Sequence, residues 1–563
     1  MAAPPPVVDL VLRGGRITTF ADAGQGPAEA EAIALAGGRV VAVGTAADVA
    51  PYEPLAARVI DLEGRRVLPG LNDSHIHAVR AGPAWTRTLH WDDVRDLAVA
   101  LRTVRDSAAA RPAGEWIPVT GGWHASQLAE RRAPTRAELD AAAPDHPVYV
   151  QELYDRAVLN SAALAACGWT DDSPDPERGT LLRDAEGRLT GEIRGVGAFA
   201  VPLAAALAVD AEEARRGVRA MTAEFARHGL TGVVDGGGLL MTPRDYDDLY
   251  SVWRAGELSV RVRTFVSAWS RGGEVEDIRA LTDLVQPGAG DHMLRIAGIG
   301  EIPHLGCHDM EGLDPFELSD AAHEELVEIV RLCARRGWRM SVHAVLDRTL
   351  GRVLDAWEQV EREEGLVSGR GWSIVHADAA SATNLDRIAR LGAGILVQNR
   401  LLLKGGDYVE AWGEDAATCA PPIAGMRSRG IPIGAGTDAT RANWFSPWAS
   451  IAWLVTGRTL DGRGARSTEH LLDRRSAIAA YTRDAAWFTG ESGTRGRLAP
   501  GYDADLMVPD ADPLTCPEED LAGIRSALTV LGGRVMHDRI TPQGITEDGR
   551  ELAGARGSER STT

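Results

Sequence analysis

The chain has 563 residues, of which 44% are hydrophobic and 25% charged, a composition typical of a globular protein rather than a disordered one. Its net charge of −20 would repel a phosphate backbone, so we expect no nucleic acid partner. Five widely spaced cysteines without a CxxC pair argue against a disulfide framework. The sequence contains neither a run of 18 apolar residues nor a recognisable signal peptide, so we expect a cytoplasmic protein with no membrane partner.

Short β segments dominate both ends of the chain. Residues 4–66 and 496–540 combine β-branched residues with Gly-containing turns, the pattern of β-hairpins. We therefore predict one small composite β-sandwich domain built from residues 1–66 and 491–545. The polar, Gly/Ser-rich residues 546–563 are predicted to be a flexible tail.

Helices and short apolar strands alternate through the centre of the chain. One helix is predicted to begin near Asp210 and end before Gly229, and a second to begin near Ser319 or Asp320. The predicted strands cover residues 231–235, 338–343, 372–377, 392–398 and 431–438. Such alternation indicates a parallel sheet, closed or open. Residues 85–205 fit it poorly, and we predict that they form an insertion after the first strand.

The segment PGLNDSHIHA, residues 69–78, carries the strongest local signal for chemistry. His75 and His77 are two apart on an apparent strand end, so both imidazoles can point to one face and reach one ion. Two histidines at this spacing are weak evidence by themselves. His343, His376 and Asp438 also follow apolar strands, and in a closed parallel barrel such strand ends meet at one mouth. Together the five residues predict a metal site, although each alone is compatible with a core or loop position.

Several stretches resemble a known family. PGLNDSHIH, SVHA, IVHA and GTDA are similar to the metal-dependent amidohydrolase superfamily. Residues 121–150, 434–459 and 481–508 resemble its amidohydrolase family 3 group, which includes N-substituted formamide deformylase, and the likeness extends from about residue 8 to 540. The resemblance implies a (β/α)8 TIM-like barrel over residues 67–490. It also implies the following metal-site residues: His75, His77, His343, His376 and Asp438.

The chain departs from the family at one position. Many relatives bridge two metal ions with a carboxylated lysine on the fourth strand, but Lys404 is the only lysine here and comes too late in the sequence. Glu301, within LRIAGIGEIPHLG, occupies the corresponding slot. Its carboxylate could bridge two ions. Alternatively, the site could hold one ion, and Glu301 could then contact one of the metal ligands or have only a structural role. These three alternatives remain open at this point.

The function expected from this site is metal-assisted hydrolysis. A divalent ion, with zinc favoured and manganese or iron also suited, would activate water and polarise a carbonyl. Asp438 would act as general base and then acid, with Glu301 as the second catalytic carboxylate. The resemblance, and nothing else in the sequence, implies that the substrate is a small amide or N-formyl or N-acyl amine. The alternatives are a lyase or decarboxylase on the same barrel and a catalytically silent binding protein.

Other residues carry weaker expectations. Four side chains in loops expected near the barrel mouth suggest binding of an apolar substituent: Trp123, His124, Trp444 and Trp448. Asp73 could orient an imidazole or cap a turn, and Asp235 could face the mouth. His304 and His308 fit a solvated loop better than a second metal cluster. The sequence leaves homo-oligomerisation open.

Overall fold

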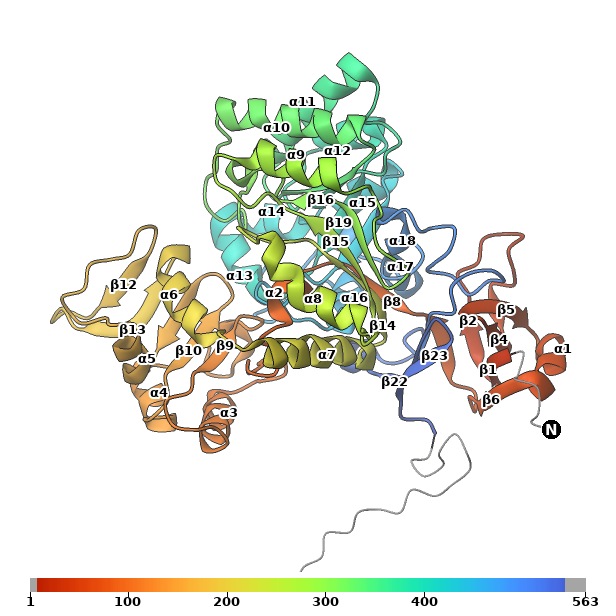
Figure 1. Ribbon diagram of the computed structural model, residues 1–563, viewed down its shortest axis with the longest axis horizontal. Coiled ribbons are helices and arrows are strands. Elements are labelled where there is room, and N and C mark those ends of the chain that lie inside the picture. The colour runs from red at the N-terminus through yellow and green to blue at the C-terminus, as the bar shows by residue number, and fades with distance from the viewer. Residues whose placement is uncertain (1–7, 542–563) are drawn as a thin grey trace, which may run out of the picture.

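A computed structural model describes residues 8–541 and is built around one parallel barrel (Figure 1). The sheet order follows the chain order from β8 to β20, and all seven pairings are parallel. The ends of the sheet meet where the Asp438 N–H donates to the His75 carbonyl at 2.8 Å and the His77 N–H donates to the Ala439 carbonyl at 2.8 Å. The predicted TIM-like barrel is therefore confirmed. Its strands are β8 (Leu71–Ile76), β14 (Leu230–Asp235), β15 (Arg261–Val266), β16 (Leu294–Glu301), β17 (Arg339–Ala344), β18 (Ser373–His376), β19 (Gly394–Gln398) and β20 (Ile433–Gly436).

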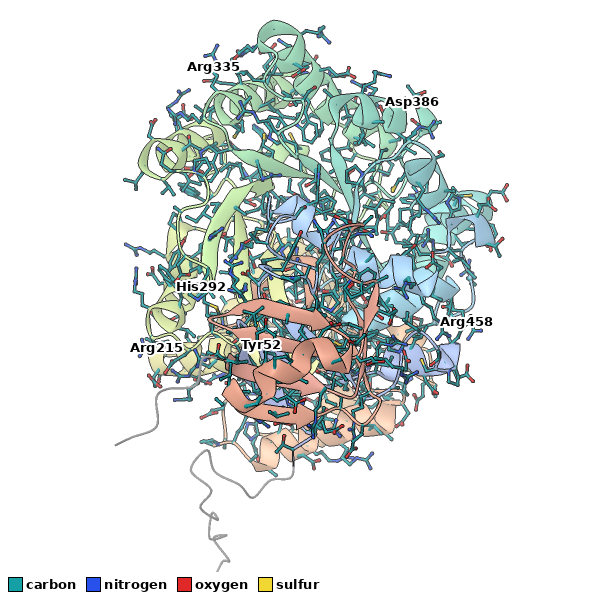
Figure 2. All side chains as sticks on the ribbon, turned by 90° about the vertical axis from the view of Figure 1, so that its right-hand side faces the viewer. Tyr52, Arg215, His292, Arg335, Asp386 and Arg458 are labelled. Atoms are coloured by element: carbon teal, nitrogen blue, oxygen red, sulfur yellow. The ribbon has the colours of Figure 1, made fainter. Side chains whose placement is uncertain are left out.

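Amphipathic helices cover the barrel. The Asp210 and Ser319 side chains cap the N-termini of α7 (Ala211–Arg227) and α10 (Asp320–Arg335), where the sequence predicted the two helices to begin. The apolar stripe of α10 is fully buried, at Leu326, Ile329, Val330 and Cys333. Charged residues such as Arg335 of α10 and Asp386 of α12 (Ala382–Leu391) lie on the outer surface (Figure 2). Further helices are α8 (Asp247–Arg254), α9 (Glu274–Leu284), α11 (Asp347–Glu364), α13 (Leu401–Trp412) and α16 (Pro447–Thr456).

Residues between β8 and α7 form a separate layer that extends from one side of the barrel (Figure 1). A five-stranded sheet in the order β12-β13-β11-β10-β9 forms its centre. The helix α6 (Val196–Ala206) packs on this sheet and then leads the chain back to α7. The strands are β9 (Ile117–Thr120), β10 (Val148–Glu152), β11 (Arg156–Leu159), β12 (Thr180–Arg183) and β13 (Leu189–Arg194).

Two further sheets contain the strands from the chain ends. One is four-stranded and drawn from the N-terminal residues alone, namely β5 (Arg39–Gly44), β4 (Ala32–Ala36), β1 (Val8–Arg13) and β6 (Ala56–Asp61). The other is six-stranded and joins both ends, namely β23 (Arg534–Asp538), β22 (Ser526–Leu531), β21 (Leu506–Pro509), β7 (Arg66–Pro69), β2 (Arg16–Thr18) and β3 (Glu29–Ala30). Leu10, Ile33, Val67 and Leu506 belong to one buried apolar cluster that both sheets share.

The predicted tail, residues 546–563, lies outside the described residues. Among residues 8–541, no helix has the length and apolar character needed to cross a membrane.

Candidate metal centre

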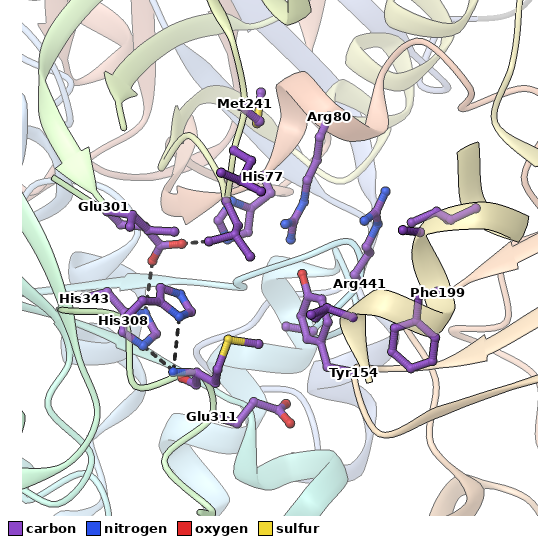
Figure 3. Close-up of a pocket in the computed structure, with 18 of the residues that line it drawn as sticks. His77, Arg80, Tyr154, Phe199, Met241, Glu301, His308, Glu311, His343 and Arg441 are labelled. Carbon is purple, nitrogen blue, oxygen red and sulfur yellow. Dashed lines mark hydrogen bonds and ion pairs between the residues drawn. The ribbon is translucent and has the colours of Figure 1, made fainter. Parts of the chain in front are cut away.

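A cavity of about 740 Å³ opens at the carboxyl ends of the barrel strands. This volume suits a small-molecule ligand. His77, Glu301, His343, His376 and Asp438 line its wall on the barrel side, and Figure 3 shows His77, Glu301 and His343 around one part of the cavity. The structure thus brings together residues that are far apart in the sequence, with 363 positions between His75 and Asp438. They meet because each lies at or just beyond the carboxyl end of a strand of the same barrel.

His75 and His77 present their imidazoles side by side, with ring centroids 5.1 Å apart. His75 Nε2 lies 3.3 Å from Glu301 Oε2, and His77 Nε2 lies 3.1 Å from Asp438 Oδ1. Gly236 leaves the space that the His75 ring occupies, since a Cβ at this position would lie 2.5 Å from the ring carbon Cε1. Any larger residue at Gly236 would displace the imidazole from the cluster.

A backbone contact orients the His77 imidazole. The His77 Nδ1–H donates to the Gly237 carbonyl at 2.7 Å, which leaves the Nε2 lone pair facing the carboxylates. Asp235 supports this turn from below, because its carboxylate accepts the N–H groups of Gly237 at 2.9 Å and Val79 at 2.8 Å. Asp235 therefore acts on the site through the backbone and does not reach the cavity. Burial raises the pKa of its carboxyl group.

Asp73 joins the two strands that close the barrel and does not touch an imidazole. Its carboxylate accepts the backbone N–H of His75 at 3.0 Å, the backbone N–H of Thr437 at 3.1 Å and the Thr437 hydroxyl at 2.6 Å. Burial raises the pKa of Asp73 to about 6, despite these hydrogen bonds. Of the two roles considered for Asp73, the geometry supports the turn-capping one.

His343 is held from behind by a residue that the sequence did not single out. Its Nε2 lies 2.9 Å from Asp309 Oδ1 and 2.9 Å from the Met310 carbonyl, so that nitrogen carries the proton and Nδ1 faces Glu301 Oε2 at 3.3 Å. Asp309 in turn accepts the backbone N–H groups of residues 345 and 346. A buried carboxylate behind a ligand imidazole is a common support in metal sites. Asp309 lies in an irregular segment, where no periodic pattern marks it.

His376 and Asp438 complete the cluster from left-handed backbone conformations, with φ of 77° and 59°. Such conformations are costly for residues other than glycine and are often found at functional sites. The Asp438 conformation is stabilised by the hydrogen bond from its own N–H to the His75 carbonyl. His376 Nδ1 is buried and has no hydrogen-bond partner among the described residues.

Glu301 lies at the centre of the cluster. Its Oε2 is 3.3 Å from His75 Nε2, 3.3 Å from His343 Nδ1 and 4.0 Å from His376 Nε2. Its Oε1 faces His77 Nε2 at 3.4 Å. Three overlapping groups have donor atoms within 4.8 Å of one another: His75, His77 and Glu301; Glu301, His343 and His376; and His75, His376 and Asp438.

The chemistry of this donor set fits a divalent cation. Glu301 and Asp438 are only 4% and 5% exposed, so their two negative charges are largely shielded from water. Burial would raise the pKa of Glu301, but the charges of His75 and His77 outweigh it and hold the pKa well below its usual value. His75 Nε2 is buried without a hydrogen bond to any described residue. A cation among these atoms would satisfy both the orphaned nitrogen and the buried carboxylates.

Metal affinity is expected to rise with pH. Burial opposes protonation of His75, but Glu301 and Asp438 outweigh it and raise the pKa of the metal-free imidazole to about 10. The pKa of His343 is raised to about 9 because hydrogen bonds to Asp309 and Glu301 outweigh its burial. A protonated imidazole cannot bind a metal, so between pH 6 and 8 binding must release these protons.

The measurement is titration of metal-free protein with Zn²⁺ at pH 6, 7 and 8. The association constant should increase roughly tenfold per pH unit for each proton released. An affinity independent of pH would contradict this assignment of the histidines.

The four residues predicted to bind an apolar substituent are not brought to the cavity. Trp123 and Trp448 are completely buried, and the Trp123 indole donates to the Gln151 carbonyl at 2.7 Å. Trp444 packs under Arg95, and His124 bonds to Ser126 at 2.8 Å. None of the four is among the residues that line the cavity. The apolar lining comes instead from Phe199, Leu203, Leu240 and Met241.

Of the remaining weaker candidates, some lie at the cavity and others do not. His304 bonds to the half-exposed Glu325 at 2.7 Å, whereas His308 stacks on His343 with centroids 4.0 Å apart and lines the cavity. The pKa of His308 is lowered to about 3 by burial, so this ring is neutral. Lys404 is paired with Asp155 at 2.7 Å and Glu311 at 2.8 Å and does not line the cavity, whereas Glu301 ends β16 and does.

A TIM-like barrel with buried histidines and carboxylates at the carboxyl ends of its strands is the arrangement of a metal-dependent hydrolase. Residues 58–537 match the model of the amidohydrolase family, so the chain belongs to this family. It is accordingly a metal-dependent enzyme that hydrolyses carbon–nitrogen bonds.

Individual proteins that are similar to this chain are consistent with its membership of the amidohydrolase family. The chain is 25% identical over 530 residues to N-substituted formamide deformylase of Arthrobacter pascens, an alignment that covers 91% of this chain and 95% of the relative. Its fold is similar to that of an uncharacterised metal-dependent hydrolase from Pyrococcus horikoshii, with a TM-score of 0.66, 21% identity and coverage of 91% and 99% of the two chains. The atrazine chlorohydrolase TrzN from Arthrobacter aurescens, solved in complex with zinc, matches with a TM-score of 0.54, 18% identity and coverage of 95% and 96%.

Proposed function

We propose that the enzyme hydrolyses a small amide or an N-formyl or N-acyl amine with an apolar substituent, and that zinc is its metal. The observation that carries the proposal is the meeting of four imidazoles and two carboxylates in one cluster, all but His75 lining a cavity of about 740 Å³. Phe199, Leu203 and Met241 supply apolar surface in the same cavity. The likeness to N-substituted formamide deformylase supports an amide or formamide as the bond that is cleaved.

Six residues would hold the metal: His75, His77, His343, His376, Asp438 and Glu301. A divalent ion bound there would polarise the scissile carbonyl and lower the pKa of a water molecule towards 7. Imidazole and carboxylate ligands suit zinc, and they also accept manganese or iron.

Asp438 is the group that we assign to proton transfer. Its Oδ1 lies at the cavity wall, 3.1 Å from His77 Nε2 and 3.4 Å from His75 Nε2. The His75 and His77 imidazoles outweigh burial and lower its pKa well below the usual value, so the carboxylate is ionised and able to accept a proton. Asp438 would take a proton from the attacking water and deliver it to the leaving nitrogen, which completes the amine product.

Glu301 is the carboxylate that we assign to a bridging position. It is the member shared by the group around His75 and His77 and the group around His343 and His376. Its two oxygens face different histidines, Oε1 towards His77 and Oε2 towards His75 and His343. A glutamate in this position offers two anionic oxygens, as a carboxylated lysine would.

If Glu301 bridges, replacing it with alanine is expected to lower the metal-to-protein ratio below that of the wild type, because the carboxylate shared by the two histidine groups is lost. Elemental analysis of purified variant and wild type measures the ratio. The control is Glu328→Ala, which removes a surface carboxylate paired with Arg279 and should leave the ratio unchanged. A Glu301→Ala protein that keeps the full wild-type ratio would return Glu301 to a supporting role.

The proposed reaction is tested with purified enzyme of known metal content on a panel of N-formyl amines, N-acyl amines, lactams and hydantoins. Release of a free amine, or ring opening, scores as hydrolysis. Reaction in ¹⁸O-labelled water should place one heavy oxygen in the acid product. Absence of label from the product would favour a lyase or decarboxylase instead.

We also infer that the two end sheets act as one β-sandwich domain, with residues 1–66 and 491–545 as its parts, because the sheets share a buried apolar cluster. The barrel would then cover residues 67–490, with residues 85–205 as an insertion. A cytoplasmic location is consistent with the five free cysteines of the chain.

A further inference from the structure

Arg80 and Arg441 line the same cavity as the candidate metal centre, and neither has an acidic partner among the described residues. Arg80 lies on α2 (Ala78–Ala81), three residues after His77, and Arg441 lies three residues after Asp438. Figure 3 shows both side chains extending into the space beside Tyr154, and Arg80 lies 5.9 Å from the centroid of the tyrosine ring. Across residues 8–541, neither guanidinium forms an ion pair or a hydrogen bond, and Arg80 Nε and Nη2 are buried without partners.

Several buried arginines of this protein have an acidic partner, although the buried Arg466 bonds only to the Pro421 carbonyl among the described residues. Arg400 also lines the cavity, but Asp378 accepts a hydrogen bond from it at 2.5 Å. Arg261 and Arg263, both 2% exposed, each form a two-bond contact with a carboxylate. Arg80 and Arg441 thus differ from Arg261, Arg263 and Arg400, each of which is paired with a carboxylate.

The environment makes this arrangement costly without a ligand. Burial and the charge of Arg80 together lower the pKa of the Arg441 guanidinium. The charge of Arg80 acts on the buried Asp235, but the two oxygens of that carboxylate are already taken by the Val79 and Gly237 backbone N–H groups. Two cations held together in a half-buried cavity are a ready site for an anion, because a guanidinium presents a planar fork of donors that matches a carboxylate.

We propose that Arg80 and Arg441 bind a carboxylate of the substrate, so that the preferred substrates are amides carrying both an acidic group and an apolar group. This inference rests on the proposed hydrolase function and names its substrate class. Tyr154 can donate its hydroxyl to the same carboxylate, since it lines the cavity beside Arg80. The scissile bond would then face His77, which lies next to Arg80 in Figure 3, and Glu301 on the far side of His77.

Apolar side chains of the same cavity, among them Phe199 beside Arg441 (Figure 3), fit the apolar part of such a substrate. Phe199 and Leu203 project from α6, the last helix of the layer between β8 and α7, and Met241 follows β14. These side chains face the cavity together with the arginines. A substrate with an acidic group but no apolar group would leave this apolar surface in contact with water. A substrate with an apolar group but no acidic group would leave the two guanidinium groups without a partner.

The test compares matched pairs of amides that differ only in the carboxylate. One pair is N-formylphenylalanine, each enantiomer separately, and N-formylphenethylamine; the other is N-benzylsuccinamate and N-benzylbutanamide. In at least one pair, kcat/KM for the acid should exceed that for the neutral amide by at least tenfold. Equal kcat/KM values in both pairs would overturn the inference while leaving the hydrolase function standing.

Variants locate the effect. Arg441→Gln and Arg80→Gln should each reduce the acid-to-neutral ratio by at least tenfold, and the lysine variants of both residues should restore part of it. The control Arg458→Gln removes an equal charge from an exposed arginine (Figure 2) and should leave the ratio unchanged. A ratio unchanged in folded Arg441→Gln and Arg80→Gln proteins would overturn the assignment.

Binding distinguishes failure of this inference from failure of the proposed reaction. If no pair is hydrolysed, the proposed function fails for these amides, and the arginines are tested by calorimetry with 3-phenylpropionate and 3-phenylpropanol. The acid should bind at least tenfold more tightly, and Arg441→Lys and Arg441→Gln should weaken it progressively. Equal binding of acid and alcohol, or acid binding unchanged in these variants, would overturn the inference.

Discussion

Replacing His75 or His343 with alanine is expected to abolish metal retention. Both imidazoles are almost completely buried, and each directs one nitrogen at the central Glu301 carboxylate at 3.3 Å. Removing either imidazole takes away one nitrogen ligand. The remaining ligands are fixed by barrel strands and cannot move to replace it. Metal content after gel filtration, measured by elemental analysis, should fall from full occupancy to below about one tenth.

A matched control comes from a histidine outside the cluster. His292 is exposed on the surface (Figure 2), with 73% of its side chain accessible, so His292→Ala should retain all of its metal. Circular dichroism checks that the His75 and His343 variants remain folded. Full occupancy in a folded His75→Ala or His343→Ala protein would refute the assignment of these residues as ligands.

Replacing Asp438 with asparagine is expected to leave metal bound and to lower kcat by a factor of about 10³. The amide is nearly the same size as the carboxylate and keeps one carbonyl oxygen that can face the metal, but it cannot take up a proton from water. General base catalysis by one side chain typically contributes a factor of about 10² to 10⁴ in rate. Parallel measurements of metal content and steady-state turnover separate the two roles of the residue.

The surface aspartate Asp386 provides the control for this change. It is paired with Arg429 on the outside of the barrel, so Asp386→Asn should alter neither metal content nor kcat. Turnover of Asp438→Asn within a factor of two of wild type would remove Asp438 from proton transfer. Loss of the metal itself would show that Asp438 acts chiefly as a ligand.

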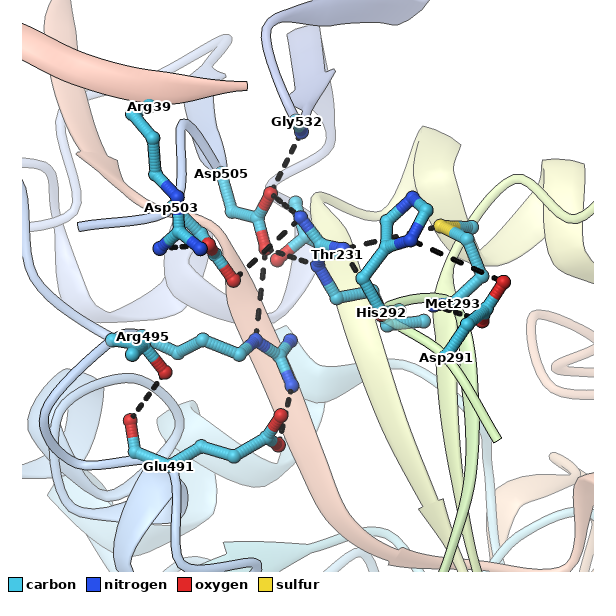
Figure 4. Close-up of polar contacts among 12 residues, drawn as sticks. Arg39, Thr231, Asp291, His292, Met293, Glu491, Arg495, Asp503, Asp505 and Gly532 are labelled. Carbon is cyan, nitrogen blue, oxygen red and sulfur yellow. Dashed lines mark hydrogen bonds and ion pairs between the residues drawn. The ribbon is translucent and has the colours of Figure 1, made fainter. Parts of the chain in front are cut away.

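One barrel strand, β15, was not predicted from the sequence. Its residues RVRTFV place Arg261 and Arg263 two positions apart, a pattern that suggests an exposed face. In the structure both arginines are buried, because Asp505 and Glu491 from the far end of the chain pair with them at 2.8 to 2.9 Å. Figure 4 shows this polar network around Asp505, Arg495 and Glu491. Partners more than 200 positions away cannot be inferred from local periodicity.

The site residues show a similar division. His75, His343 and His376 could be predicted because each stands at the end of an apolar strand, where a parallel barrel gathers side chains. Asp309 could not, since it lies in an irregular segment and its role depends on a contact with His343 across 34 positions. The aromatic residues Trp123 and Trp448 were predicted to meet the substrate, yet they are buried in the core. Loop position alone does not decide whether a large side chain packs inwards or faces a cavity.

By itself the sequence determined the alternation of strands and helices, the parallel barrel and the residues at its strand ends. These features follow from local periodicity and from the family motifs, which act over a few residues. Only the tertiary structure decided that Glu301 lies between two pairs of histidines and that Arg80 and Arg441 share one cavity without described partners. The physical reason is that charge compensation and cavity shape depend on distances between side chains from different strands, which the order of residues along a chain does not contain.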